Sequence, residues 1–493
     1  MGATYNSLER QQLDAPKCHP NTRVAVMQRL MSWIKGEIDV DALILWIYGA
    51  AGAGKSAIAH TLAEMCEECG CLLATFFFWK TAAERNNVGR FTATIAYQIA
   101  RGIPASRRFI EIAIDADPMI FQQSVDVQLA KLIIEPMRHL HSTGFNFKES
   151  PFVIIIDGLD ECRGNDIQSG LVKSLAAAFH HSPLRIRILI ASRPEVYLRS
   201  SFDSSSLQSR LSRLALSDEH STGEDIRRFL EDSFDKIKHE HPLASYIPSS
   251  WPSADVLHEL TEKSSGQFIY ASTTVKYTGG DPYELPTRRL DVIRRLQPPR
   301  GEEDLPYAEL NSLYHHVLSN VRDIERVKDI LGVLIITGPV VRQRRAFDTT
   351  QSIDDFFLWH PGETKACLSP LESIIRCDGE GRISFFHASL SDFLLDPSRS
   401  CRFYLCRESI LGNCAALGLR HLRWRELEFY CGLILPSRKF IHRVLIRRTF
   451  YARLLSLRRH YALLHFRCLV LHPSTPRGTV STITSRSLGS RCN

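Results

Sequence analysis

The eight residues GAAGAGKS, which begin at Gly49 and end at Ser56, have the types and spacing that bind phosphate groups. They satisfy the pattern G-x-x-x-x-G-K-[ST] at every fixed position, between an apolar segment and a helix-forming one. Glycines allow such a loop to turn its N–H groups inward, and the helix N-terminus adds partial positive charge. Lys55 is predicted to reach the β- and γ-phosphates, and the Ser56 hydroxyl to ligate Mg²⁺. The residues predicted to contact the nucleotide are Gly49, Ala50, Ala51, Gly52, Ala53, Gly54, Lys55 and Ser56.

A second segment supplies carboxylates. PFVIIIDGLDEC, residues 151–162, reads as an apolar strand that ends in acids, as a buried parallel strand is expected to look. Asp157 is predicted to hold Mg²⁺ through its water shell. Asp160 and Glu161 follow three and four residues later and are predicted to orient or deprotonate the attacking water.

A third apolar segment, RIRILIASRPE at residues 185–195, has Arg193 near its carboxyl end. Ligands collect at the carboxyl ends of the strands in open α/β sheets, so the three segments are expected to converge on one triphosphate. Arg193 is predicted to act as a sensor of the γ-phosphate, because its planar fork matches phosphate oxygens. The alternative is a salt bridge to an acid at the edge of the sheet.

The pattern around these segments predicts an α/β domain with a parallel sheet covered by helices on both faces. The expected strands are residues 42–48, 72–78, 152–156, 186–191 and 213–216, and the expected helices are 22–35, 91–101 and 127–140. After residue 217 the strand patterns stop. Apolar residues at helical spacing then continue through 254–263, 267–277 and 305–337, after a helix with Ser221 as its N-cap.

Residues 349–397 mix short helices with a strand at 383–386, as a winged helix would. The sequence therefore predicts a leader and helix at 1–41, a nucleotide-binding core at 42–217, a helical domain at 218–345 and a winged-helix-like domain at 346–397. A helix and an arginine-rich tail would occupy 398–493.

Together these motifs resemble the NACHT-type members of the STAND class of P-loop NTPases, and in particular the fungal NACHT proteins. The resemblance covers residues from about 10 to about 430. It rests on CHPNTR at 18–23, the GAAGAGKS loop, FFFW at 76–79, RFTATIAYQIA at 90–100, DGLDE at 157–161 and ASRPE at 191–195.

Two later segments extend the resemblance. SSGQFIYASTTV, residues 264–275, is similar to the helix start that packs near the adenine in this class, although Phe268 stands where proline is usual. RISFFHASLSDFLL, residues 382–395, is similar to the end of a winged helix. The resemblance implies that His387 touches the ADP phosphate in a closed state. The alternative for His387 is a packed or helix-capping residue.

The resemblance implies a signalling switch that binds ATP or ADP with Mg²⁺. ADP would hold the core, helical and winged-helix domains closed, and ATP would open them for self-association. Slow hydrolysis would reset the switch, with Glu161 or Asp160 positioning water and Lys55, Mg²⁺ and Arg193 stabilising charge. Nonself recognition or regulated cell death in a fungus is the expected biological role.

Two other functions stay open, and the first of them depends on the charge of the C-terminal residues. Residues 401–493 contain 17 Lys plus Arg and 3 Asp plus Glu, whereas the whole 493-residue chain has a net charge of only +7. Such a segment can bind nucleic acid or an anionic membrane surface. One alternative function is a nucleic-acid-dependent ATPase that uses the winged helix and this tail. A disordered or poorly packed tail is the interpretation that the sequence favours. The other alternative function is a scaffold that binds nucleotide without turnover.

Composition excludes several classes of protein. Apolar and charged fractions of 44% and 23% are typical of globular proteins. The longest apolar run, residues 330–341, is shorter than the roughly twenty residues of a membrane span. The N-terminus lacks the apolar segment of a secretory signal, so a cytoplasmic protein is expected. CEECGC at 66–71 lacks the further ligands that a zinc site needs.

Overall fold

The computed structural model describes residues 3–7, 15–80, 82, 84–145, 152–180, 186–205, 207–216, 222–298, 307–340, 349–414 and 417. The chain divides into two units, Met1–Arg420 and His421–Asn493, and all described residues belong to the first. The arginine-rich tail lies outside the described residues, as does the predicted N-cap Ser221.

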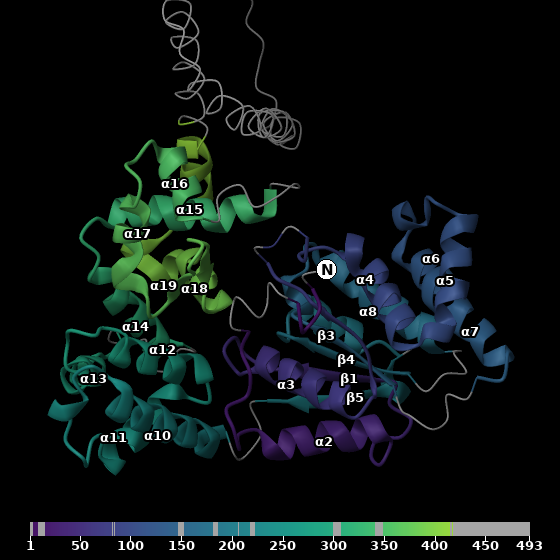
Figure 1. Ribbon diagram of the computed structural model, residues 1–493, viewed down its shortest axis with the longest axis horizontal. Helices are drawn as coiled ribbons and strands as arrows, with labels where there is room; N and C mark the ends of the chain where they lie inside the picture. Colours follow the sequence, from purple (N-terminus) through teal and green to yellow (C-terminus); the bar gives the residue numbers. More distant parts are fainter. Residues whose placement is uncertain are drawn as a thin grey trace, which may run out of the picture. The chain divides into compact units, whose positions relative to one another are not determined.

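A parallel five-stranded sheet forms the core, as predicted (Figure 1). Its strands are β1 (Ile44–Tyr48), β2 (Leu72–Phe77), β3 (Phe152–Asp157), β4 (Ile186–Ser192) and β5 (Leu211–Ala215). They lie in the order β2-β3-β4-β1-β5. Tyr48 pairs with Ser192, and Asp157 pairs with Ala191. The three strands that carry the predicted site therefore end level with one another.

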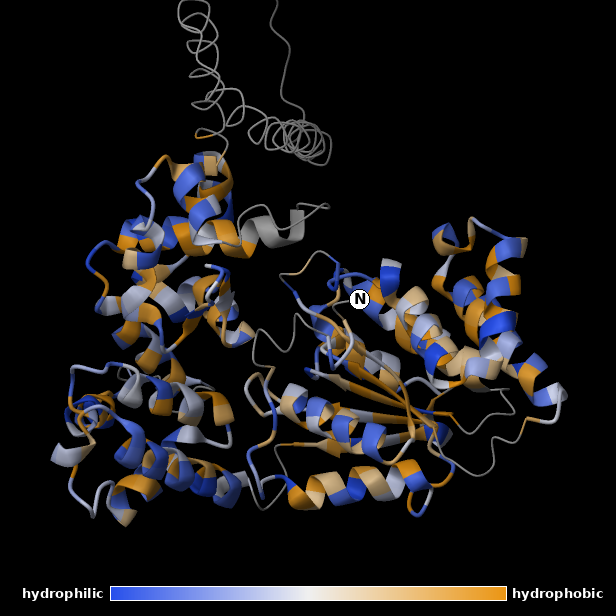
Figure 2. Ribbon diagram, viewed as in Figure 1, coloured by the Kyte–Doolittle hydropathy of each residue, from blue (hydrophilic) through white to orange (hydrophobic). Residues whose placement is uncertain are grey.

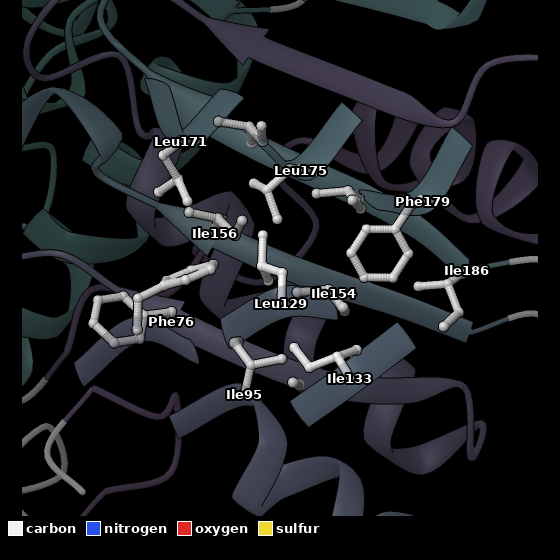
Figure 3. Packing of buried hydrophobic residues seen from close by; sticks show 14 of the residues in the cluster. Phe76, Ile95, Leu129, Ile133, Ile154, Ile156, Leu171, Leu175, Phe179 and Ile186 are labelled. Carbon is white, nitrogen blue, oxygen red and sulfur yellow. The ribbon is translucent and has the colours of Figure 1, made fainter. Parts of the chain in front are cut away.

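Alternate residues of each strand face opposite layers of helices. Val153 and Ile155 of β3 pack in one cluster with α2 (Val24–Lys35) and α3 (Lys55–Glu68). Ile154 and Ile156 pack in another with α4 (Phe91–Gly102) and α8 (Asn165–His180) (Figure 3). The inner strands β1, β3 and β4 are largely hydrophobic because both of their faces are buried, whereas the edge strand β5 exposes Arg213 (Figure 2).

The core contains further helices between α4 and β3. The predicted helix at 127–140 is present, but it is divided into α6 (Val125–Leu129), a π-helical turn (Ala130–Ile134) and α7 (Glu135–Ser142). Helix α5 (Pro104–Ala116) was not predicted. Ser106 and Ile110 of α5 are buried, and Phe109, Ala113 and Ile114 pack partly buried against the same core cluster at helical spacing. The short α9 (Val196–Phe202) follows β4.

The described residues of 222–298 and 307–340, after the core, form helices and their connections. The helices are α10 (Thr222–Glu240), α11 (Ala254–Ser264), α12 (Phe268–Gly279), α13 (Pro286–Arg295), α14 (Ala308–Ser319) and α15 (Ile324–Val340). The predicted helical stretch at 305–337 is thus two helices. Helix α13 was not predicted, because it buries only Pro286, Leu290 and Ile293. None of the described helices has both the length and the apolar character that crossing a membrane requires.

The last described elements surround a small antiparallel hairpin. Strand β6 (Ile375–Cys377) pairs with β7 (Ile383–Phe385), which confirms the predicted strand. The helices are α16 (Thr350–Phe357), α17 (Glu363–Leu368), α18 (Ala388–Leu394) and α19 (Pro397–Ser400). The Tyr314 hydroxyl of α14 lies 2.8 Å from Oγ of Ser389 in α18. Assignment as a winged helix, and the domain boundaries, stay predictions.

Candidate functional site

The glycine loop lies between β1 and α3, where the sequence places it. Gly52 and Gly54 have φ angles of +81° and +91°, a conformation that residues with a Cβ rarely adopt. The Lys55 ammonium donates hydrogen bonds of 2.8 Å to the carbonyl oxygens of Gly49 and Ala50. The loop and its lysine thus have the backbone conformation and charge that fit a phosphate chain.

The electrostatic surroundings of Lys55 favour an anion. Burial lowers the pKa of Lys55 to about 8; the carboxylate of Asp160 opposes this shift, and the positive charge of Arg193 adds to it. Any group that lowers the pKa of a lysine disfavours its charged form. A phosphate beside Lys55 would raise this pKa again, so phosphate binding and protonation of Lys55 support each other.

The acids that follow β3 form a tight turn. Asp157 is only 4% exposed. Gly158 has a φ of +69°, and a short 3₁₀ turn (Leu159–Glu161) brings the next acids back toward the strand end. Burial raises the pKa of Glu161 to about 7, with added repulsion from Asp160 and Asp157. A carboxyl group with this pKa is suited to accept a proton at neutral pH.

Asp160 is paired with Arg193. Its Oδ1 accepts the main-chain N–H of Arg193 at 2.9 Å, and its Oδ2 lies 3.2 Å from Nε of the same residue. The salt bridge that the sequence left open as an alternative is therefore present. Since Asp160 is occupied in this way, Glu161 is the better candidate for positioning water.

His387 is the N-cap of α18. Its Nδ1 accepts the N–H of Ser389 at 3.1 Å and lies 2.7 Å from the Ser389 hydroxyl. Burial lowers the pKa of His387 to about 4, and the positive charges of Arg193 and Lys55 add to the shift. The imidazole is therefore neutral at neutral pH, with its proton on Nε2. His387 thus caps α18, and the charges of Arg193 and Lys55 also act on its ring. The contact with an ADP phosphate stays a prediction.

Sequence reasoning missed two charged residues. Asp392 of α18 lies 2.6 Å from Nη1 of Arg193 and 3.1 Å from Nζ of Lys80. Lys80 follows β2 in the same way that Arg193 follows β4. A cationic residue directly after the FFFW strand end could therefore have indicated Lys80 in the sequence. Asp392 carried no such signal, because it is a single acid in the short helix α18, between Ser391 and Phe393.

Helices outside the core contact the glycine loop directly. The N–H of Ala51 donates a 3.0 Å hydrogen bond to the hydroxyl of Tyr307, the N-cap residue of α14. A Cβ at Gly52 would overlap the side chain of Ile269 in α12. The loop predicted to bind phosphates is therefore in contact with the starts of two later helices.

Arg23, from the CHPNTR motif, links the same parts and was also missed. Its guanidinium is buried and donates to the carbonyl oxygen of Ala53 at 3.1 Å and to Oγ1 of Thr222 at 2.9 Å. It also lies 5.1 Å from the ring centroid of Phe268. A phenylalanine in place of the usual proline thus supplies a cation–π partner at the start of α12.

Residues 25–193, less than half of the chain, match the family model described as the N-terminal part of nephrocystin 3. This match supports a likeness to NACHT- and STAND-type P-loop ATPases. No curated protein matches the chain.

Similar solved structures include a STAND protein with a tetratricopeptide repeat sensor from Pyrococcus horikoshii. Its TM-score is 0.41 at 14% identity, over 91% of this chain and 54% of that protein, so this chain spans about half of its length. Cdc6p from Pyrobaculum aerophilum has a TM-score of 0.34 at 13% identity, over 76% of this chain and 92% of that one. Likeness at this level carries no argument about activity.

Proposed function

We propose that this protein is a signalling switch that binds ATP and ADP and hydrolyses ATP slowly. The observation that carries the proposal is the level ending of β1, β3 and β4, which supports Lys55, Asp157 and Arg193 acting on one phosphate chain. Ligands of open α/β sheets bind at this edge. The pKa shifts of Lys55 and Glu161 belong to groups at the same edge, as expected of a functional site.

Each residue of the site has a separate role in ATP hydrolysis. Lys55 and Arg193 stabilise the charge that develops on the γ-phosphate, and Glu161 accepts a proton from the attacking water. Ser56 and Asp157 would hold Mg²⁺, whose contribution when bound is to neutralise charge on the phosphate oxygens. Asp157 fits this role because it is a buried carboxylate at the end of a strand.

A switch requires that the nucleotide bias the arrangement of the domains. The contacts of the loop with Tyr307 and Ile269 support such a coupling, because a change at the phosphates reaches α14 and α12 directly. ADP then favours the closed arrangement, to which the Nε2–H of His387 contributes by donating to a phosphate. ATP favours an open arrangement that self-associates. The biological role of the switch is nonself recognition or regulated cell death in the cytoplasm of a fungus.

The test is to identify the nucleotide that co-purifies with the full-length chain and to measure its molar mass by light scattering. We expect ADP with the monomer, and a larger assembly after exchange for a non-hydrolysable ATP analogue with Mg²⁺. A chain that carries no nucleotide and binds neither ADP nor the analogue would overturn the proposal. ATPase activity that requires added DNA would point instead to the nucleic-acid-dependent ATPase.

A further inference from the structure

We propose that Lys80 is a second residue that binds the γ-phosphate beside Arg193, and that the carboxylate of Asp392 holds both cations until ATP displaces it. Asp392 would thereby set the preference between ADP and ATP, which differ only in that phosphate. This inference rests on the proposed function.

The geometry is that of one carboxylate bridging two cations. Oδ2 of Asp392 lies 2.6 Å from Nη1 of Arg193, and its Oδ1 accepts a 3.1 Å hydrogen bond from Nζ of Lys80. Lys80 follows β2 and Arg193 follows β4, and β3 lies between these two strands in the sheet. The bridge thus joins the two sides of the strand that carries Asp157.

Electrostatics require an anion at this position. Burial alone would raise the pKa of Asp392, but the charges of Arg193 and Lys80 hold it below its ordinary value, so the group is a carboxylate. The Asp392 side chain is 17% exposed and that of Arg193 is 24% exposed, so solvent screens the pair weakly. Two neighbouring cations without an anion would repel each other.

The γ-phosphate meets the same requirement. It offers oxygens of high charge that pair with a guanidinium and an ammonium. Because Arg193 and Lys80 are bound by Asp392, a γ-phosphate must compete with that carboxylate for them. ADP has no γ-phosphate and leaves the bridge intact. Competition of this kind couples ATP binding to the release of Asp392, and with it of α18, from the two cations.

Release of Asp392 would reach the rest of the molecule through α18. This helix carries His387 at its N-cap and is tied to α14 through Ser389 and Tyr314. Helix α14 in turn begins at Tyr307, whose hydroxyl accepts the Ala51 N–H of the glycine loop. The γ-phosphate would therefore disturb α18 and α14 together.

The test compares the affinities of full-length variants for ADP and for a non-hydrolysable ATP analogue. Asp392→Asn keeps the shape of the side chain and removes its charge. We expect it to lower the Kd of the ATP analogue on the order of tenfold and to leave that of ADP unchanged or raised. Asp355→Asn is the matched control, because it removes the same charge at an exposed position of α16.

Lys80→Gln gives an independent measurement. The Lys80 side chain is 50% exposed, so its replacement threatens folding less than a change at Asp392. We expect the Kd of the ATP analogue to rise on the order of tenfold while that of ADP stays the same. In the double variant, Lys80→Gln should cancel part of the gain from Asp392→Asn.

Equal effects of Asp392→Asn on both nucleotides, or unchanged ATP affinity in Lys80→Gln, would overturn the inference. If Asp392→Asn does not fold, the ATP and ADP affinities of Lys80→Gln alone test the inference. A wild-type chain that binds neither nucleotide would instead overturn the proposed function. Wild-type binding of both nucleotides, with no selective effect in either variant, rejects only this inference.

Discussion

The main-chain N–H of Lys80 donates a 2.9 Å hydrogen bond to Oε2 of Glu161. This contact ties the loop after β2 to the turn after β3, and it orients the carboxyl group that is the best candidate for the general base. A glutamine can accept the same hydrogen bond through its amide oxygen, so charge can be removed from this group without removing its support.

Glu161→Gln should therefore keep ATP bound and lose turnover, because the carboxylate acts on water and not on the phosphate. Loss of a general base lowers a rate by roughly 10²- to 10⁴-fold. Steady-state phosphate release and ATP affinity are measured in parallel. Asp160→Asn is the comparison variant, since it weakens the support of Arg193 instead. A Glu161→Gln rate equal to that of wild type would remove Glu161 from the mechanism.

Lys55→Ala should weaken nucleotide binding strongly. The change removes a charge-assisted contact worth about 1.5–3 kcal/mol, which corresponds to roughly a ten- to hundredfold weaker affinity. Titration with a fluorescent ATP analogue measures the effect. Lys35→Ala is a suitable control, because it removes a lysine at the far end of α2. ATP affinity unchanged by Lys55→Ala would refute the assignment of the glycine loop.

The sheet, and the edge at which three of its strands end together, could be predicted because their signals are local. GAAGAGKS, DGLDE and ASRPE each combine an apolar strand with a reactive residue at its carboxyl end. In a parallel sheet those ends meet at one edge, so the rule that joins distant segments is general. The strand register, with Asp157 opposite Ala191, confirms this part of the prediction.

The contacts of α18 with the core could not be predicted, since their partners are remote and their types are ordinary. Lys80 and Asp392 are 312 positions apart, and an acid within an amphipathic helix usually faces solvent. Arg23 is similar, because its partners Ala53 and Thr222 lie in different elements. Pairings of this kind depend on how the helices pack, which no local pattern encodes.

Arg23→Lys should weaken the contact between the core and α12. A lysine keeps the positive charge but has no planar fork to reach Ala53 and Thr222 together, and it stacks less well on Phe268. We expect a loss of about 1–3 kcal/mol in the free energy of unfolding, measured by urea denaturation. Arg29→Lys, at an exposed position of α2, is the control and should have no effect. Equal stability of both variants would contradict the linking role of Arg23.

Acid should destabilise the protein partly through His387. Its folded pKa of about 4 lies below the ordinary value of 6.5, so the unfolded chain binds the proton first as the pH falls. The groups that act on the ring are Arg193, which follows β4, Lys55 of α3 and Asp392 of α18. The free energy of unfolding is thus fully retained above pH 6.5 and declines toward pH 4, by up to about 2 kcal/mol between pH 7 and 5. Urea denaturation at both pH values should show a smaller decline in His387→Asn than in wild type. An equal decline would mean that His387 titrates normally.

His387→Asn also separates the two roles of the histidine. Asparagine is a good N-cap residue, so it should keep the start of α18 intact, whereas alanine loses the cap at a cost of about 1 kcal/mol. Neither can replace an imidazole Nε2–H that donates to an ADP phosphate. Loss of that hydrogen bond, about 1.5–3 kcal/mol if charge-assisted, should weaken ADP binding by roughly ten- to a hundredfold and ATP binding less. The open arrangement would then be favoured, and light scattering should detect assembly without exchange for ATP. If His387→Asn binds ADP as wild type does and only His387→Ala is affected, His387 serves α18 as a cap and has no part in nucleotide binding.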